Sequence, residues 1–401
     1  MKSILLIMPY GSVGGMERLA LHFYNYYKNQ GYQVKALKFI ALESDIINFN
    51  EDEFTLSNKD LSELSAFKRL YFYITGPLKL RQIIKKNDIT HSIAFGDMAN
   101  IFSALTYTSE FKVGSIHALK SVELNSTSFF TKITKTAYRT IYKKLNKVVC
   151  ISTAIKKDLL LNCNYKFPKN LKVIYNPHDI YSIENLSKEP LDNEKEKNIF
   201  KRQTIIFIGR LSNQKSPWHL INAFNHILNK NKEVNLVFIG DGDQQVVNYI
   251  KNLIKTYNID DKIYFLGRKS NPYKYLKQAT VLALSSHYEG TPNVIVEAIA
   301  LGTPVVSSNC TQGILELMSV KNQIQNKGNT ITESGIITPN LYKGALGFPS
   351  SNKISKEELY FSDALLKILE DPDFKIILNL NKEQLLKKFD IEITANNYLK
   401  N

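Results

Sequence analysis

Short apolar runs alternate with amphipathic segments along most of the chain. In the first half we expect strands at 3–8, 32–40, 89–95, 111–116, 146–152 and 171–175. The rhythm restarts with expected strands at 204–209, 234–240, 262–267, 280–286 and 304–308. Between them lie helical patterns, such as the 3.6-residue apolar repeat in 220–228. This alternation predicts an α/β protein whose mainly parallel sheets are covered by helices.

A charged stretch at 184–202, which contains Pro190, interrupts the rhythm. The 401 residues are enough for two domains. We expect the following organisation: an N-terminal Rossmann-like domain at 1–185, a linker at 186–202, a second Rossmann-like domain at 203–381 and an amphipathic helix at 382–401. Residues 320–345 resemble a polar insertion. A cleft between two such domains would be the natural ligand site.

Composition narrows the cellular setting. The three cysteines are scattered, which favours a reducing compartment over a disulfide framework or a zinc cluster. The amino-terminal apolar run is too short for a signal peptide, and no run reaches the roughly 18 residues of a membrane span. We therefore expect a cytoplasmic protein. The net charge of +15 indicates an anionic partner, unless it is only a solvated basic surface.

The stretch HYEGTPNVIVEA, residues 287–298, places carboxylates in an apolar setting. Glu297 is the only ionisable side chain between Glu289 and Glu316. A buried, unpaired carboxylate is strongly unfavourable, so Glu297 needs a partner or a ligand. Helical geometry turns Glu297 about 130° away from the apolar face formed by its neighbours. It can therefore face a ligand in the cleft, although a structural ion pair is the competing reading.

A helix is expected to begin inside the same stretch. Thr291 is the expected N-cap and Pro292 the first helical residue. The backbone amides from Pro292 through Asn293 to Val294 would then face a phosphate group. Glu289 and Glu297 also suggest the carboxylate pair of a glycosidase. That alternative gives no role to the cations described next.

Two cations follow another expected strand, in the sequence IGRLSNQKSPWHL. Arg210 leaves the strand and Lys215 lies five residues later, just before Ser216 and Pro217, which suit the start of a helix. Cations at a helix N-terminus oppose the helix dipole. An anion should offset them, and a diphosphate is the leading candidate.

Two further junctions are weaker signals. Gly11, Gly14 and Gly15 follow the first strand, where they either bring backbone amides close to a ligand or form a plain turn. Their spacing is not that of a dinucleotide fingerprint. Asp241 and Asp243 form an Asp-x-Asp pair that would suit Mn²⁺ or Mg²⁺, but we favour capping of the helix at 244–254. No metal is expected.

These residues resemble the retaining family 4 glycosyltransferases with the GT-B fold. Glu289 and Glu297 match the E-x7-E motif of that family. Further similar stretches, in the family's order, are GSVGGMERLA, VVCISTAIKKDL, IYNPHD, FIGRLSNQKSP, LVFIGDGDQ, IYFLGRKSNPYKYL and LGTPVVSSNC. The resemblance implies two Rossmann-like α/β/α domains facing across a cleft, with the C-terminal helix returning to the first domain.

The resemblance also implies a role for each candidate residue. Arg210 and Lys215 would bind the diphosphate in place of a metal, Glu297 the ribose and Glu289 the donor sugar. The amides of 292–294 and the loop at Gly14 and Gly15 would contact phosphate. Gly267 and Arg268 would lie along the base, and His117 near the donor sugar and acceptor.

The activity implied is transfer of a hexose or N-acetylhexosamine, with retention, from a UDP-sugar to a glycan acceptor, which we expect to be lipid-linked, in surface polysaccharide synthesis. Alternatives are a nucleotide-sugar epimerase and a non-catalytic nucleotide-sugar-binding scaffold. Basic residues mixed with aromatics at 65–86, and the cations Lys132, Lys135, Arg139 and Lys143, suit an anionic membrane surface. We therefore expect peripheral attachment to the inner face of the cell membrane, and no nucleic-acid partner.

Overall fold

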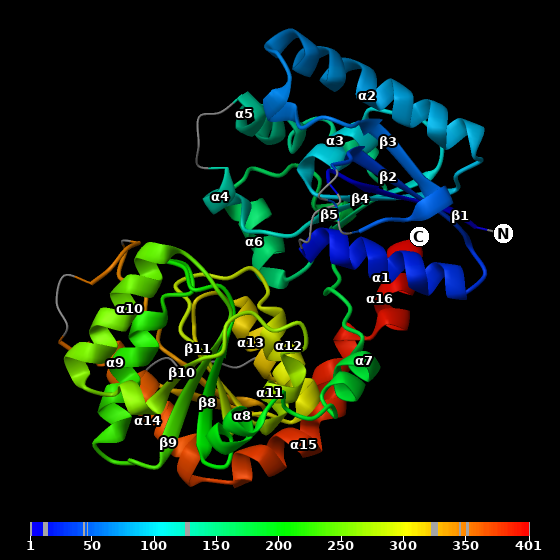
Figure 1. Cartoon of the computed structure of the whole chain (residues 1–401). Helices are drawn as coiled ribbons and strands as arrows, with labels where there is room; N and C mark the ends of the chain where they lie inside the picture. The colour runs from blue at the N-terminus through cyan, green and yellow to red at the C-terminus, as the bar shows by residue number, and fades with distance from the viewer. Residues whose placement is uncertain are drawn as a thin grey trace. The chain divides into compact units, whose positions relative to one another are not determined.

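The computed structural model describes residues 2–10, 15–42, 45, 47–124, 129–321, 328–344, 346–349 and 353–400. The chain forms two compact units, one of residues 1–178 with 388–401 and one of residues 179–387. Each contains one seven-stranded sheet flanked by helices (Figure 1). The predicted α/β class with parallel sheets is confirmed.

The first unit is a doubly wound sheet in the order β3-β2-β1-β4-β5-β6-β7, with all strands parallel. Its strands are β1 (Ser3–Met8), β2 (Gln33–Ile40), β3 (Glu53–Ser57), β4 (His91–Phe95), β5 (Phe111–Ile116), β6 (Lys147–Cys150) and β7 (Leu171–Val173). Its helices are α1 (Gly15–Asn29), α2 (Ala66–Lys86), α3 (Asp97–Ala104), α4 (Lys120–Glu123), α5 (Phe129–Ala137), α6 (Thr153–Leu161) and α16 (Ile391–Leu399).

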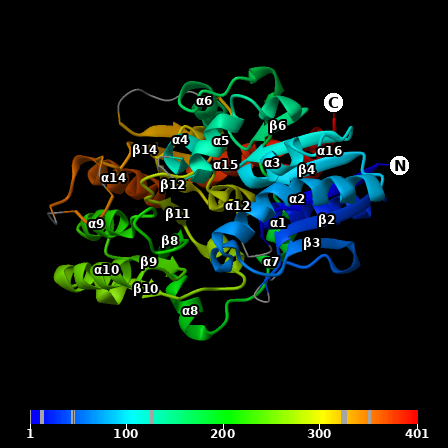
Figure 2. The same cartoon turned by 90° about the horizontal axis from the view of Figure 1, so that it is seen from above.

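Alternation along β1 divides the core of this unit into two layers. Ile4 and Leu6 pack in the cluster that includes residues of α1 and α16, while Leu5 and Ile7 pack with residues of α2 and α3. All four are fully buried, as expected for a central parallel strand. The same arrangement of helices around the sheet is visible from above (Figure 2).

The second unit has the strand order β10-β9-β8-β11-β12-β14-β13. Its strands are β8 (Gln203–Ile208), β9 (Val234–Ile239), β10 (Ile263–Phe265), β11 (Val281–Leu284), β12 (Val305–Ser308), β13 (Thr330–Thr332) and β14 (Gly335–Thr338). Its helices are α7 (Ile180–Leu186), α8 (Glu194–Ile199), α9 (Pro217–Leu228), α10 (Gln244–Tyr257), α11 (Tyr273–Gln278), α12 (Asn293–Leu301), α13 (Gly313–Met318), α14 (Lys356–Glu370) and α15 (Asp373–Leu386). Among the described strands of this unit, only β13 runs antiparallel to its neighbour.

Three segments differ from the sequence prediction. The expected insertion at 320–345 contains β14, whose four residues are buried and pair in parallel with β12. The edge strand β3 was missed, because its alternation is short: Phe54 and Leu56 are its only apolar residues, and none of its five residues is fully buried. The expected single helix at 382–401 is the end of α15 followed by the separate helix α16.

The segment expected to be a linker, 186–202, is built into the second unit. It contains α8, and its side chains bond to the loop before α11 and to α11 itself. Lys269 Nζ lies 2.8 Å from both Asp192 and Glu196, and the Tyr275 hydroxyl oxygen lies 2.7 Å from each of the same two carboxylates. The charges of segment 186–202 thus form ion pairs within the second unit. The boundary between the two units lies earlier, at 178–179.

Candidate functional site

The candidate donor site lies where the strands of the second sheet end. Because parallel strands share one carboxyl edge, the loops after β8, β9, β10 and β11 meet there. The β8 and β9 loops touch through the backbone, since Leu211 N donates to Asp241 O and Asp243 N donates to Leu211 O, both at 2.9 Å. The β9 and β10 loops join through Gly240 N and Gly267 O, 2.9 Å apart. Neighbouring backbones thus bring four sequence-distant loops together.

Glycines permit this close approach. A side chain at Gly240 would place its Cβ 2.1 Å from the carbonyl oxygen of Gly209, and one at Gly242 would lie 2.0 Å from that of Leu211. Both contacts are with backbone atoms, which cannot move aside cheaply. The loops can therefore pack in this way only if these two positions lack side chains.

Lys215 and Glu289 form an ion pair at this edge. The Nζ atom of Lys215 lies 2.6 Å from Glu289 Oε1, which also accepts a hydrogen bond of 2.7 Å from Ser286 Oγ. Glu289 is buried and Lys215 is half-buried. The sequence predicted that an anion offsets Lys215 and assigned that role to a ligand. The structure shows that a protein carboxylate already does so.

The loops that carry this pair are held together by further hydrogen bonds. Ser216 Oγ donates to Ser285 O at 2.7 Å, and His287 N donates to Gln214 O at 2.8 Å. Ser216 and Pro217 begin α9 as predicted, although the Ser216 hydroxyl makes this bond between loops instead of capping the helix. The pair therefore sits on a rigid support.

Arg210 follows β8 directly and is exposed. Within the described part of the chain no carboxylate pairs with it. Lys215 and Arg210 thus differ: one cation is paired and partly covered, and the other is open to solvent. An exposed, unpaired guanidinium can still bind an anion in bidentate fashion.

Helix α12 begins one residue later than predicted. Its N-cap residue is Pro292 and not Thr291, and Asn293 is its first residue. Since proline has no N–H, only Asn293 and Val294 among the three predicted amides can donate to a phosphate. The hydroxyl of Thr291 is buried and has no hydrogen-bond partner among the described residues. This end of α12 therefore offers two amides and one hydroxyl.

Glu297 is half-buried on α12, whereas the residues from Val294 to Leu301 around it are buried. The predicted helical phase is thus correct for this residue.

The remaining donor-site candidates lie on the β9 and β10 loops. Gly267 has a left-handed backbone, with φ of 68°, and Arg268 is exposed, with its Nε 3.9 Å from Asp241 Oδ2. Asp243 occupies the N-cap position of α10, but its side chain makes no capping bond, contrary to the expected role. Within the described ranges no three His, Cys, Asp or Glu side chains are grouped as a metal site.

His117 lies in the first unit, at the end of β5. Its Nε2 atom is 2.8 Å from Ser115 Oγ, whose proton goes to Ala94 O. His117 Nε2 must therefore be the donor, which leaves Nδ1 as an acceptor. Burial, together with the charge of Lys120, lowers the pKa of His117 to about 3, so the ring is neutral at physiological pH. Of the predicted glycines, Gly11 and Gly14 lie outside the described residues, and Gly15 begins α1.

Comparisons with known proteins agree with this architecture. Residues 13–181 match the family described as Glycosyltransferase Family 4, and residues 190–329 match Glycosyl transferases group 1. An uncharacterized glycosyltransferase of Methanocaldococcus jannaschii is 31% identical over 68% of this chain and 66% of its own length. The chain belongs to the family 4 glycosyltransferases.

Two other similarities extend over nearly the whole of this family 4 chain. A Campylobacter jejuni α-1,4-N-acetyl-D-galactosaminyltransferase, named for a GalNAc-GalNAc-diNAcBac-PP-undecaprenol substrate, is 26% identical over 100% of this chain and 98% of its own. The crystal structure of Anabaena HepE in complex with UDP superposes with a TM-score of 0.72 and 18% identity, covering 99% of this chain and 98% of that one. The latter likeness establishes the GT-B fold.

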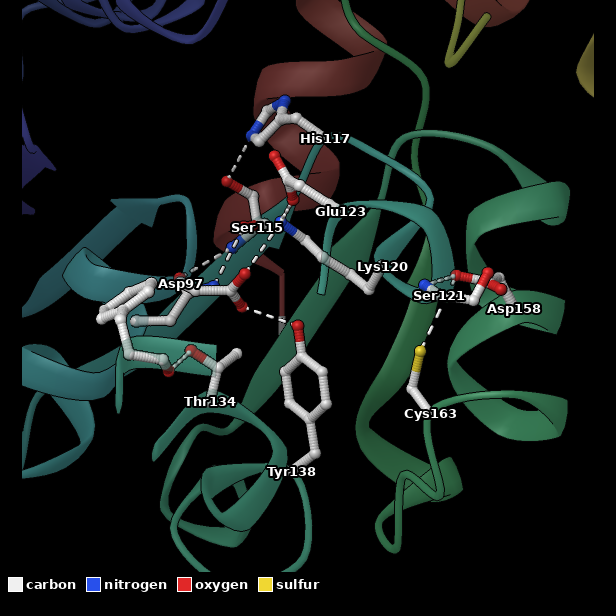
Figure 3. A network of polar contacts seen from close by, with 12 residues as sticks. Asp97, Ser115, His117, Lys120, Ser121, Glu123, Thr134, Tyr138, Asp158 and Cys163 are labelled. Carbon is white, nitrogen blue, oxygen red and sulfur yellow. Dashed lines mark hydrogen bonds and ion pairs between the residues drawn. The ribbon is translucent and has the colours of Figure 1, made fainter. Parts of the chain in front are cut away.

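Sequence reasoning missed a buried cluster next to His117 in this glycosyltransferase. Asp97 accepts a hydrogen bond of 2.8 Å from the Tyr138 hydroxyl, and its other oxygen lies 2.8 Å from Lys120 Nζ (Figure 3). The Tyr142 hydroxyl donates to Asp97 as well, at 2.7 Å. Lys120 also pairs with Glu123. The only sequence signal was an Asp just beyond the end of a strand, in FGDMAN, since its partners lie more than twenty residues away.

Proposed function

We propose that this protein transfers a hexose or N-acetylhexosamine from a UDP-sugar to a lipid-linked glycan, with retention of anomeric configuration. The observation that carries the proposal is the Lys215–Glu289 ion pair beside the start of α12. A cation, a carboxylate, two backbone amides and the Thr291 hydroxyl thus lie at the carboxyl edge of a parallel sheet. This edge is the usual binding place for nucleotides in such folds. The HepE structure contains UDP, which supports the choice of base.

In this proposal the donor lies along the carboxyl edge. The amides of Asn293 and Val294 and the cations Arg210 and Lys215 bind the diphosphate, and Glu297 accepts hydrogen bonds from the ribose. Glu289, held by Lys215 and Ser286, orients hydroxyls of the donor sugar. Gly267 and Arg268 adjoin the base. Every assignment uses a residue of the second unit with a matching hydrogen-bond capacity.

Retention requires the acceptor oxygen to attack the face that the leaving group vacates. The bond between the sugar C1 and the diphosphate oxygen breaks, a bond from the acceptor oxygen to C1 forms, and the acceptor proton passes to the departing phosphate. Lys215 and Arg210 stabilise the charge that grows on the diphosphate, which is the largest catalytic term in many enzymes. No side-chain base is needed, and no metal is proposed.

The acceptor is proposed to be a polyprenyl-diphosphate-linked glycan. The Campylobacter jejuni relative that matches the full chain is named for such a substrate. Transfer of labelled sugar from UDP-N-acetylgalactosamine or UDP-galactose to prenyl-diphosphate glycosides would test this proposal. Conversion of the donor to its epimer without an acceptor would instead indicate an epimerase.

Helix α2 is the proposed contact with the membrane. Five large apolar side chains on one face are more than half exposed: Phe67, Leu70, Tyr71, Ile74 and Leu78. The helix carries cations and no acid. The predicted aromatics Phe72 and Tyr73 instead pack inward. No described helix is long and apolar enough to span a bilayer, so we propose peripheral binding to anionic lipid on the cytoplasmic side.

The second predicted basic region has a different shape from the one expected. Lys132 and Lys135 lie on α5, but that helix ends at Ala137, so Arg139 and Lys143 do not continue its face. All four cations are exposed. They add to the positive charge of the first unit without forming the predicted single helical stripe, and α2 is therefore the main candidate.

A further inference from the structure

A cavity of about 630 Å³ lies within the first unit. It is lined by the aromatic residues Tyr10 and Tyr73 and by the polar residues His117, Lys120 and Glu123. Asp97 also borders it. Apolar surface and a few convergent polar groups are the composition of small-molecule sites.

The charged groups at this cavity form one chain of hydrogen bonds. Both oxygens of Asp97 are engaged, because one accepts from two tyrosines and the other binds Lys120. Lys120 is buried, and although burial lowers its pKa, the charges of Asp97 and Glu123 outweigh this and raise the pKa. Lys120 thus stays charged and in place. Asp97 is a positioning residue, and it directs Lys120 toward Glu123.

Glu123 is the solvent-exposed end of this series of hydrogen-bonded side chains. Among the described residues it is bound only to Lys120, through Oε2, and its side chain is 54% exposed. Oε1 can therefore accept a hydrogen bond from a ligand, while Lys120, with two of its three N–H groups used by carboxylates, has one left to donate. A donor and an acceptor side by side match two neighbouring hydroxyls of a sugar ring. The aromatic walls suit the apolar faces of that ring.

The sign of the charge decides which sugars fit. Among the described residues that line the cavity, the charged ones are Asp97, Lys120 and Glu123, and His117 is neutral. Two carboxylates against one ammonium leave a net negative charge, which repels an anion. Just outside, Asp60 lies beside Tyr10 and Arg69 beside Tyr73, so these two charges offset each other.

We propose that Lys120 and Glu123 bind adjacent hydroxyls of an uncharged acceptor sugar and that Glu123 excludes acidic sugars from this cavity. The inference rests on the proposed transfer to a glycan acceptor, and it names which part of the acceptor enters the first unit. The diphosphate of a lipid-linked acceptor must then lie outside the cavity.

Saturation-transfer NMR with simple glycosides tests this on the full chain. Methyl glucoside and methyl glucuronide differ only at C6, as do the matching galactosides. The protein should bind the neutral member of at least one pair at about 10 mM, roughly tenfold more tightly than the acidic member. In Glu123→Gln the preference should shrink to within about twofold, because the repelling charge is gone while the size is kept.

Glu51, an exposed acid on the same unit away from the cavity, provides the matched control. Glu51→Gln should keep the tenfold preference. An unchanged preference in Glu123→Gln, or no binding of any glycoside to the parent protein, would overturn the inference. UDP binding, measured in the same samples, separates the two proposals. If the parent protein does not bind UDP, the donor assignment is wrong. The glycoside preference is measured independently of that result.

Discussion

The Nζ atom of Lys215 lies 2.6 Å from Oε1 of Glu289, across 74 positions of the chain. The two residues belong to the loops after β8 and β11, which are neighbouring strands of one parallel sheet. Lys215 therefore has two roles in our account: it stabilises a buried carboxylate before the donor binds and meets the diphosphate afterwards. Separating these roles gives the first prediction.

Lys215→Ala should lower kcat by about 10²–10³-fold, because it removes a positive group from the leaving diphosphate. It should also destabilise the fold by about 3–5 kcal/mol, since Glu289 is left buried and unpaired. Steady-state kinetics and denaturant unfolding measure the two effects. Lys230→Ala is the control: its pair with Asp363 is 3.8 Å long and exposed, so both values should stay near those of the parent. If Lys215→Ala leaves both kcat and the free energy of unfolding unchanged, the assignment of Lys215 is wrong.

Glu297→Ala should weaken UDP binding by roughly tenfold, because a carboxylate that accepts from ribose hydroxyls makes strong hydrogen bonds. Titration calorimetry with UDP measures the dissociation constant. Glu316, on α13, is a suitable acidic control for Glu297. If Glu297→Ala and the parent bind UDP equally, Glu297 does not contact the ribose.

Transfer should persist in excess EDTA, because the cations already offset the diphosphate charge. The double variant Asp241→Ala with Asp243→Ala should keep most of its activity, as neither side chain is a capping group or a proposed ligand. Stability should change by less than about 1 kcal/mol. Activity that disappears with EDTA and returns with Mn²⁺ would favour a metal-dependent enzyme.

Acid should destabilise the first unit through His117. Its pKa is about 3 in the folded protein against 6.5 for the free side chain, so the unfolded chain binds the proton more tightly. This contribution is complete above pH 6.5 and is lost as pH falls from 6.5 toward 3. His117→Asn should therefore flatten the fall in unfolding free energy between pH 6.5 and 4. His178 and His287, whose pKa values are lowered to about 4, keep the remaining slope. An identical slope in the variant would show that His117 is not held neutral.

Ile74→Asp on α2 should abolish co-sedimentation with vesicles that contain anionic phospholipid, because it places a charge in the exposed apolar face. Leu161, at the end of α6, is 79% exposed and lies on another helix of the same unit. Leu161→Asp should bind vesicles like the parent. Equal loss in both variants would show that binding depends on overall charge instead of on α2.

Much of the fold followed from the sequence because buried parallel strands leave a strong signal. Strands such as SILLIM and VNLVFI each have five apolar residues in six and are buried throughout. β14 gave no such signal, since its GIIT is short and follows polar residues. The linker prediction failed because a charged segment can be either exposed or paired with distant residues, and the sequence does not distinguish the two. Here Glu196 pairs with Lys269 and Tyr275, more than seventy positions away.

The residues of the candidate site could be predicted where their position depends only on the parallel direction of the strands. Residues just after parallel strands meet at one edge, which brought Arg210, Lys215 and Glu289 into one proposal. The direct pairing of Lys215 with Glu289 was not visible, because side-chain reach across two loops depends on their exact path. The same limit hid the pair of Asp97 and Lys120, since the two tyrosines that bond to Asp97 lie beyond the end of α5, in a turn and in the short 3-10 helix that follows it.

The anomeric configuration of the product tests the central claim most directly. A UDP-sugar labelled with ¹³C at C1, a prenyl-diphosphate glycoside acceptor and EDTA would be incubated with the protein, and the product examined by NMR. Our account predicts an α-linked product, the configuration of the donor, formed at a rate that Lys215→Ala reduces. A β-linked product, or no transfer from any UDP-sugar, would contradict it.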